Sequence, residues 1–204
     1  MVVMRIVAVV LAAGEGRRLG GPKALLRFGD ATFLAHSSGL FLRPGIAAVI
    51  AVLGYEAERV AVEARLPPAA TTVINTRYRE GMLGSVLRGL EAAEEAGAEA
   101  VLLHPVDHPL VDPATIDRVV AALEAGAVVA VPSHGDRRGH PGGFVRECWP
   151  ALRAVPPERG ARALIADRPQ WVVHVPGDPG CVIGIDTPED YARWIEGREP
   201  SGSP

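Results

Sequence analysis

The chain has 204 residues, of which 48% are hydrophobic and 22% charged, and its formal net charge is −3. This length allows one α/β domain with a sizeable core, and the slightly acidic balance excludes the broad basic surface that nucleic-acid binding requires. Its two cysteines, Cys148 and Cys181, lack C-x-x-C spacing, which argues against a disulfide framework or a cysteine zinc site and predicts a cytoplasmic protein with free thiols.

The first predicted element is a strand over Arg5–Ala12, an apolar run that leads into a glycine-rich segment. Residues 1–13 contain Arg5 and are too short for a membrane span or a signal peptide, so we expect no membrane association. Helices and strands then alternate. The expected helices are 31–42, 56–65, 84–96 and 112–126, and the expected strands are 47–53, 72–75, 100–106 and 127–131.

This alternation predicts an α/β fold with a doubly wound, mostly parallel, Rossmann-like sheet and helices on both faces. The strands are apolar with few interruptions, as expected for strands buried on both sides. Ligands bind to such sheets beyond the carboxyl ends of the strands. Because Gly14, Gly54, Asn75 and Asp107 all follow predicted strands at those ends, we expect them to share one site.

The pattern changes after residue 132. Residues 135–143 are rich in Gly, Arg and His, and short strands are expected over 171–175 and 181–185. A helix is expected over 188–195, with Thr187 as its N-cap, Pro188 at its first position and Asp190 where a capping box places an acid. We interpret this stretch as a small C-terminal elaboration of a single domain over residues 1–196, followed by a disordered tail over 197–204.

The segment after the first strand, residues 11–23, reads LAAGEGRRLGGPK. Glycine-rich turns let backbone N–H groups surround an anion, and cations that follow can stabilise its charge. The dinucleotide fingerprint G-x-G-x-x-G fails because its third glycine position falls on Leu19, and the P-loop pattern fails because Pro22 replaces its lysine. The segment therefore predicts a phosphate-binding loop of another kind, with the pattern G-x-G-x-R-x-G-x-P-K.

This loop resembles that of the nucleotidyltransferases, which attach a nucleoside monophosphate to a phosphorylated acceptor. Within that superfamily the chain looks most like the molybdenum cofactor cytidylyltransferases. The resemblance covers nearly the whole chain, and the further matching motifs are, in order, Gly54-Tyr55, Asn75, Gly81-Met82, Ser85, Val106-Asp107-His108-Pro109, Gly139-His140-Pro141, Gly160-Ala161-Arg162 and residues 185–191. It implies transfer of CMP from CTP to the terminal phosphate of molybdopterin, with Mg²⁺ as cofactor, and a molybdenum hydroxylase or its chaperone as a further partner.

Nucleotidyl transfer requires alignment of two phosphates and neutralisation of their charge. We expect Lys23 at the α-phosphate and Arg18 at the leaving pyrophosphate, as the catalytic residues. The resemblance implies that Asp107 and Asp186 hold Mg²⁺, a cation that commonly binds one or two carboxylates together with substrate phosphates. It also implies that the nucleotide lies against Leu11, Ala12, Ala13, Gly14, Gly16, Asn75, Gly81 and Ser85.

The sequence departs from the family on the acceptor side. His140 matches a family position near the acceptor, but His108 and Gly142-Gly143 replace residues that relatives carry. The Ala12-Ala13 pair favours a pyrimidine, because guanylyl-transferring relatives tend to have Gly at the second position. The alternatives are guanylyl or other nucleotidyl transfer to a different acceptor, such as a sugar or polyol phosphate, or a non-catalytic nucleotide- or cofactor-binding module.

Overall fold

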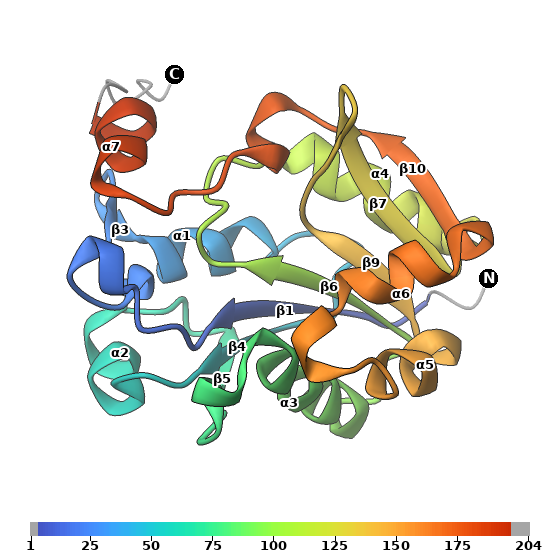
Figure 1. Cartoon of the computed structure of the whole chain (residues 1–204), viewed down its shortest axis with the longest axis horizontal. Coiled ribbons are helices and arrows are strands. Elements are labelled where there is room, and N and C mark those ends of the chain that lie inside the picture. The colour runs from blue at the N-terminus through green and yellow to red at the C-terminus, as the bar shows by residue number, and fades with distance from the viewer. Residues whose placement is uncertain (1–3, 197–204) are drawn as a thin grey trace.

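A computed structural model describes residues 4–196, which form a central sheet covered by helices on both faces (Figure 1). The order of the strands is β10-β7-β9-β6-β1-β4-β5, with β8 paired to β7. β9 runs antiparallel to β6 and β7, and β8 antiparallel to β7, whereas the other neighbouring pairs are parallel. The strands are β1 (Ile6–Ala12), β4 (Ala48–Leu53), β5 (Ala70–Ile74), β6 (Ala100–Pro105), β7 (Val129–His134), β8 (Arg137–Arg138), β9 (Gly142–Val145) and β10 (Val172–Pro176).

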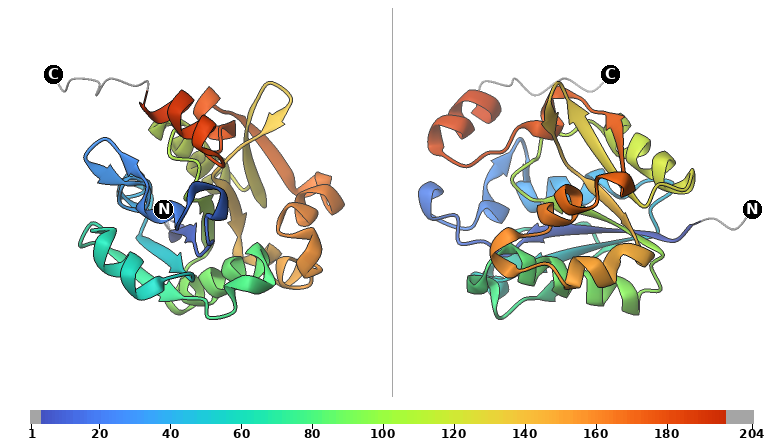
Figure 2. Two further views of the ribbon diagram at one scale, coloured as in Figure 1. Left: turned by 60° about the vertical axis from the view of Figure 1, so that its left-hand side comes forward. Right: turned by 45° about the vertical axis from the view of Figure 1, so that its right-hand side comes forward.

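Helices cover both faces of this sheet, as the views in Figure 2 show. One hydrophobic cluster joins the sheet to α1 (Phe33–Leu40), α2 (Ala57–Glu63) and α4 (Pro113–Glu124). A second cluster on the opposite face joins it to α3 (Met82–Glu95), α5 (Trp149–Arg153) and α6 (Arg162–Asp167). The mostly parallel, doubly wound α/β architecture predicted from the sequence is therefore confirmed.

The central strand β1 explains why both faces need cover. Its seven residues are all buried. Successive side chains of a strand point to opposite faces, so Ile6 and Ala8 join the first cluster while Val7 and Val9 join the second. An uninterrupted apolar strand of this kind is stable only when helices pack on both sides.

Most element boundaries agree with the sequence predictions to within a few residues, but one predicted strand is wrong. Residues 181–185 do not form a strand, because a 3₁₀ turn occupies Pro179–Val182. The Asp178 carboxylate fixes this turn: it accepts hydrogen bonds from the N–H groups of Gly180 and Asp112 and from the hydroxyl of Thr115. The local apolar pattern is thus overridden by a polar contact to a distant helix.

Several short elements were not predicted. They are the hairpin of β2 (Arg27–Phe28) and β3 (Ala31–Thr32), the strands β8 and β9, and the helices α5 and α6. The C-terminal helix α7 (Pro188–Tyr191) begins with the predicted capping box between Thr187 and Asp190 and continues as a π-helical turn, Ala192–Glu196. The single domain over residues 1–196 stays a prediction, and the predicted tail over 197–204 lies outside the described residues.

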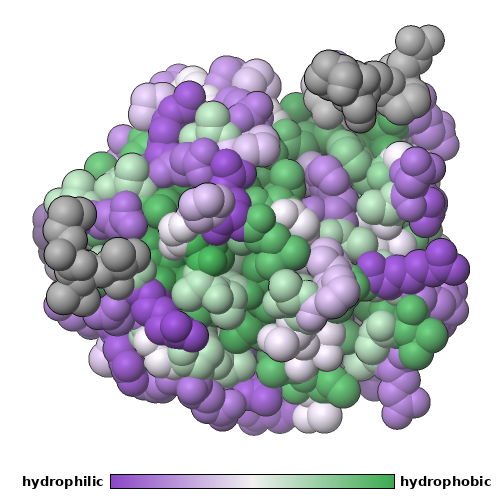
Figure 3. Space-filling model, turned by 180° about the vertical axis from the view of Figure 1, so that it is seen from behind, coloured by the Kyte–Doolittle hydropathy of each residue, from purple (hydrophilic) through white to green (hydrophobic). Residues whose placement is uncertain are grey.

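The surface carries hydrophilic side chains around the periphery of the face seen in Figure 3 and hydrophobic ones across its middle. The exposed large hydrophobic side chains include Val62 of α2, Met82 of α3 and Val173 of β10, which belong to separate elements. Within residues 4–196, no helix has the length and apolar character needed to cross a membrane.

Helix α3 packs on the sheet through a glycine. A Cβ atom added at Gly89 would collide with the side chain of Val9 in β1 and would lie 3.2 Å from that of Val52 in β4. Val9 is fully buried and β-branched, so it has little freedom to move away. This close approach brings the N-terminal end of α3 to the edge of the sheet where polar residues gather.

We expect Gly89→Ala to lower the free energy of unfolding by about 1–2 kcal/mol, because overpacking outweighs the gain in helix propensity. Gly84→Ala is the matched control in the same helix. Its Cβ would lie 3.5 Å from the Asn75 side chain, an ordinary contact, so it should raise the free energy of unfolding by about 0.5–1 kcal/mol. Urea denaturation measures both, and a stabilised Gly89→Ala variant would contradict the packing described above.

Candidate functional site

The glycine-rich loop after β1 turns sharply at Gly16. This residue has φ +61°, and a Cβ atom there would collide with the carbonyl oxygen of Gly21. The Gly16 carbonyl accepts hydrogen bonds from the N–H groups of Leu19 and Gly21, which closes the loop. Among the described residues, the N–H groups of Gly14, Glu15 and Gly16 donate to no partner. Three consecutive amides are thus available to an anion.

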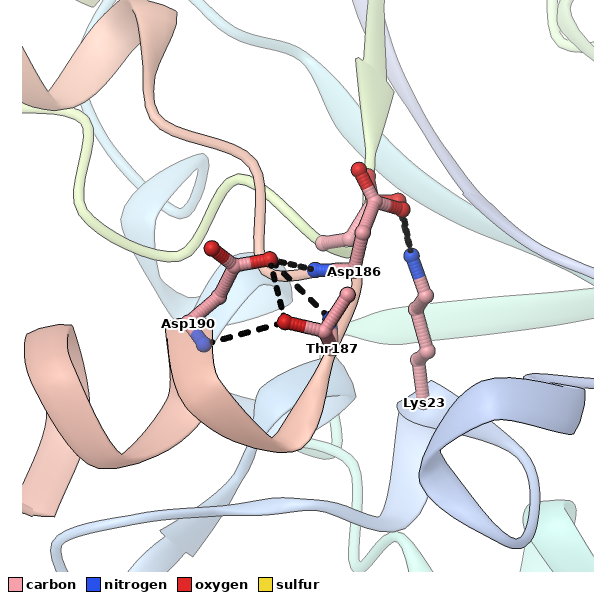
Figure 4. Close-up of polar contacts among 5 residues, drawn as sticks. Lys23, Asp186, Thr187 and Asp190 are labelled. Atoms are coloured by element: carbon pink, nitrogen blue, oxygen red, sulfur yellow. Dashed lines mark hydrogen bonds and ion pairs between the residues drawn. The ribbon is translucent and has the colours of Figure 1, made fainter.

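Lys23 lies directly after this loop, and its ammonium group lies between two carboxylates. Nζ donates to Oδ2 of Asp107 at 2.7 Å and to Oδ1 of Asp186 at 2.5 Å. Figure 4 shows the Lys23 side chain extended toward Asp186. The side chains of Lys23 and Asp107 are 18% and 22% exposed, whereas that of Asp186 is 58% exposed. The structure therefore brings together three residues that lie 84 and 163 positions apart in the chain.

Backbone contacts hold the two acids side by side. Asp107 follows β6, and its carbonyl oxygen accepts a hydrogen bond of 2.8 Å from the N–H of Ile185, next to Asp186. The Asp190 carboxylate accepts hydrogen bonds from the N–H groups of Asp186 and Thr187 and from the Thr187 hydroxyl (Figure 4). The capping box of α7 therefore also fixes the backbone that carries Asp186.

The charges of the two acids dominate the environment of Lys23. Burial lowers the pKa of Lys23, but the charges of Asp107 and Asp186 and their hydrogen bonds outweigh burial, so the pKa is raised above that of a free lysine. Lys23 is therefore positively charged at neutral pH.

A divalent cation fits the same two acids. Both already contact one positive atom, and carboxylate oxygens are the ligands that Mg²⁺ and Mn²⁺ prefer. Throughout residues 4–196 no group of three or more His, Cys, Asp or Glu side chains is arranged to hold a metal ion. A cation at Asp107 and Asp186 would therefore depend on further oxygens from a phosphate or water.

Arg18, the other predicted cation, is exposed in the 3₁₀ turn Arg17–Leu19. Within the described part of the chain, it forms no hydrogen bond or ion pair. Arg17 instead pairs with Glu15 at 2.5 Å, and Glu15 also accepts from Arg79 at 3.3 Å. Glu15 thus joins the loop to the segment before α3. The sequence did not predict these contacts, although the i, i+2 spacing of Glu15 and Arg17 was a signal for their ion pair.

The predicted nucleoside contacts fall into two groups. Leu11, Ala12 and Ala13 are buried at the end of β1, and Gly81 lines a cavity beside them together with Leu11. Asn75 and Ser85 are buried and bond to each other, with 3.0 Å from Nδ2 to Oγ. Their contact with a nucleoside stays a prediction, and in this structure they join the end of β5 to α3.

Gly54, at the end of β4, allows the loop to pack closely. A Cβ there would lie 2.7 Å from the Cβ of Tyr78 and 2.8 Å from the carbonyl oxygen of Ala13. That carbonyl accepts a hydrogen bond of 3.0 Å from the N–H of Tyr55. The Gly54-Tyr55 motif therefore holds the start of the glycine-rich loop against the neighbouring strand.

The cavity has a volume of about 920 Å³ and lies over the carboxyl ends of β1 and β6 and the middle of β7. His140 lines it, and the ring of His140 packs against that of His108 with 4.6 Å between centroids. Because His108 follows Asp107, His140 connects the cavity to the Lys23 site. Burial and then the charge of His108 lower the pKa of His140 to about 3, so His140 is neutral at physiological pH.

Residues 8–174 match the family described as the MobA-like NTP transferase domain. The chain is 35% identical to nicotine blue oxidoreductase of Paenarthrobacter nicotinovorans over 200 residues, which cover 93% of this chain and 96% of that protein. It is also 35% identical to the molybdenum cofactor guanylyltransferase of Cereibacter sphaeroides, over 62% of this chain and 63% of that one. A bifunctional GlmU protein of Azorhizobium caulinodans is 37% identical over 69% of this chain and 31% of its own length. A bifunctional IspD/IspF enzyme of Rhizorhabdus wittichii is 38% identical over 63% of this chain and 33% of its own length.

Several solved structures have the same fold as this protein over almost the whole chain. Rv0371c of Mycobacterium tuberculosis has a TM-score of 0.80 and 29% sequence identity, and the match covers 96% of this chain and all of that one. A second structure of Rv0371c is a complex with manganese, with a TM-score of 0.80, 27% identity and the same coverage. A nucleotidyl transferase of Methanothermobacter thermautotrophicus has a TM-score of 0.79 and 26% identity, over 94% of this chain and 96% of that one.

Acid is expected to destabilise the fold through His140. In the unfolded chain its pKa is near 6.5, so between pH 6.5 and about 3 the unfolded state binds a proton that the folded state does not. The free energy of unfolding should therefore fall by about 1.4 kcal/mol per pH unit from this group as the pH decreases below 6.5. Urea denaturation at pH 7 and pH 5 measures the loss, and His140→Gln should reduce it, whereas the exposed-site control His174→Gln should not.

Replacement of Lys23 should change cation binding. Lys23→Met removes the ammonium group that neutralises the two acids, so we expect the protein without nucleotide to bind Mn²⁺ about tenfold more tightly than the wild type. Titration followed by electron paramagnetic resonance of free Mn²⁺ measures this change. Lys23→Met combined with Asp107→Asn should bind Mn²⁺ weakly, and an equal Mn²⁺ affinity in Lys23→Met and wild type would contradict a shared cation position.

Proposed function

Because the chain belongs to the MobA-like NTP transferase domain family, we propose that it transfers a nucleoside monophosphate from a nucleoside triphosphate to a phosphorylated acceptor. The specific reaction proposed is transfer of CMP from CTP to the terminal phosphate of molybdopterin. An oxygen of the acceptor phosphate forms a bond to the α-phosphorus while the bond to the β-phosphate oxygen breaks, and pyrophosphate leaves. Such a reaction asks the protein for alignment and charge neutralisation.

The observation that carries this proposal is the position of Lys23 between Asp107 and Asp186, directly after the loop with three available amides. A protein that merely held a nucleotide would gain little from two neighbouring carboxylates, since they repel its phosphates. Together with a divalent cation they instead favour phosphates at this edge of the sheet. The arrangement therefore supports an enzyme over a binding module.

Each group has a distinct task in the proposed reaction. The amides of Gly14, Glu15 and Gly16 bind the triphosphate, and the exposed guanidinium of Arg18 neutralises the charge of the departing pyrophosphate. The ammonium group of Lys23 moves next to the α-phosphate, where negative charge develops. Mg²⁺, held by Asp107 and Asp186, would supply the remaining neutralisation of phosphate charge.

The choice of base and acceptor is the finer part of the proposal. CTP is favoured by the Ala12-Ala13 pair, whereas the Cereibacter relative is named a guanylyltransferase, so GTP is the second candidate. His140 lines the cavity that would receive the acceptor. Two buried free thiols, Cys148 and Cys181, favour a cytoplasmic location, where a molybdenum hydroxylase or its chaperone would receive the product.

Pyrophosphate release tests the proposal. With each of the four nucleoside triphosphates, with and without molybdopterin, and with Mg²⁺ or Mn²⁺, we expect release that requires the acceptor and is fastest with CTP. Lys23→Ala and Asp107→Asn should each lower kcat by about 10²–10³-fold, the usual effect of removing a group that stabilises transition-state charge. Asp117→Asn is the matched control, because Asp117 of α4 pairs with Arg43 at 2.7 Å, in a separate ion pair.

Two outcomes would contradict the proposal. Full turnover in Lys23→Ala would remove the role given to that residue. Absence of pyrophosphate release with every triphosphate, combined with oxidoreductase activity on nicotine blue in the same preparation, would place the chain with its Paenarthrobacter relative in activity as well as in sequence.

A further inference from the structure

The cavity beside the Lys23 site has one basic edge. Its lining is largely apolar and includes Leu11, Val86, Leu103 and Phe144. Across from α3 it is closed by the segment before α6, whose 3₁₀ turn Pro157–Arg159 contacts α3. Figure 1 shows this segment and α6 on the same side of the sheet as α3. Three arginines, Arg138, Arg159 and Arg162, line this part of the wall.

A second hollow adjoins the first at these arginines. It has a volume of about 340 Å³, and its described lining consists of Arg138, Arg159, Arg162, Ala163 and Ala166. The three guanidinium side chains therefore belong to the walls of both hollows. Their approach from β8, from the 3₁₀ turn and from α6 concentrates positive charge at one place.

The three arginines differ in their partners. Arg159 forms a bidentate ion pair with Asp167, at 2.7 and 2.8 Å, which fixes its guanidinium in the wall. Arg138 and Arg162 form no hydrogen bond or ion pair with any other described residue. The like charges of Arg138 and Arg162 repel each other, and an anion at this edge relieves the repulsion. The planar fork of arginine suits phosphate and carboxylate groups in particular.

Gly142 makes room in the cavity. It lines the wall in β9, and a Cβ there would lie 3.0 Å from the ring of Phe144. A larger residue at this position would press on that ring and fill part of the space. The absence of a side chain at Gly142 therefore keeps the space beside the Phe144 ring open to an apolar group.

We propose that the cavity binds an amphipathic anion: an apolar, ring-sized body rests against the α3 side, and its anionic group binds Arg138 and Arg162. As the acceptor of the reaction above, which this identification rests on, the ligand would carry a second anionic group, the phosphate that reacts, past His140 to the Lys23 site. Arg162 belongs to the Gly160-Ala161-Arg162 motif, to which no role has been assigned above. The proposal gives that arginine a function in acceptor selection.

A pair of fluorescent probes tests the subsite without nucleotide or metal. Anilinonaphthalene sulfonate has two aromatic bodies and one anionic group, and N-phenyl-1-naphthylamine has the same bodies without the charge. We expect the wild type to bind the sulfonate about tenfold more tightly than the neutral probe, the gain expected from charge-assisted hydrogen bonds. Inorganic phosphate should compete with the sulfonate and leave binding of the neutral probe unchanged.

The double variant Arg138→Gln, Arg162→Gln should lose this preference and bind both probes equally. Its affinity for the neutral probe should stay at the wild-type value, which would show that the cavity is intact. Arg168→Gln is the matched control, because Arg168 lies over the Trp171 ring, with 5.5 Å from Cζ to the ring centroid, and lines neither hollow. An unchanged preference in the double variant, or equal binding of both probes by the wild type, would overturn the subsite. Since no nucleotide is present, either result is independent of pyrophosphate release.

Discussion

One charged cluster, the Lys23 ammonium group between the carboxylates of Asp107 and Asp186, determines the electrostatics at the carboxyl ends of β1 and β6. Two carboxylates that approach one another at the end of the sheet repel, and a cation between them relieves that repulsion. Lysine supplies that cation from within the chain. The same requirement makes the cluster responsive to ligands, because any divalent ion or phosphate that arrives alters the balance of charge on all three groups.

The fold explains why three remote residues meet. Parallel strands direct their carboxyl ends to one edge, so the loops after β1 and β6 begin side by side, and the N–H of Ile185 secures the third segment to Asp107. Tight backbone approaches at Gly16 and Gly54 then give the glycine-rich loop a single shape. Rigid placement of this kind lowers the entropy lost when a phosphate is bound.

Local patterns in the sequence predicted the alternating elements and the capping box at Thr187, because these depend on neighbours within a few residues. Contacts between distant segments were beyond such patterns. The apolar residues after Gly180 read as a strand, yet Asp178 bonds to Thr115 in α4 and turns the chain instead. In the same way, motifs pointed to Asp107 and Lys23 separately, whereas their mutual ion pair depends on the order of the strands.

Strand β9 has a consequence for synthesis on the ribosome. It is inserted antiparallel between β6 and β7, although both of those strands emerge earlier. Until residues 142–145 leave the exit tunnel, the apolar edge of β6 lacks its neighbour and exposes unpaired backbone groups. The place of β9 in the sheet therefore makes pairing along this edge of β6 depend on residues that are synthesised after β7.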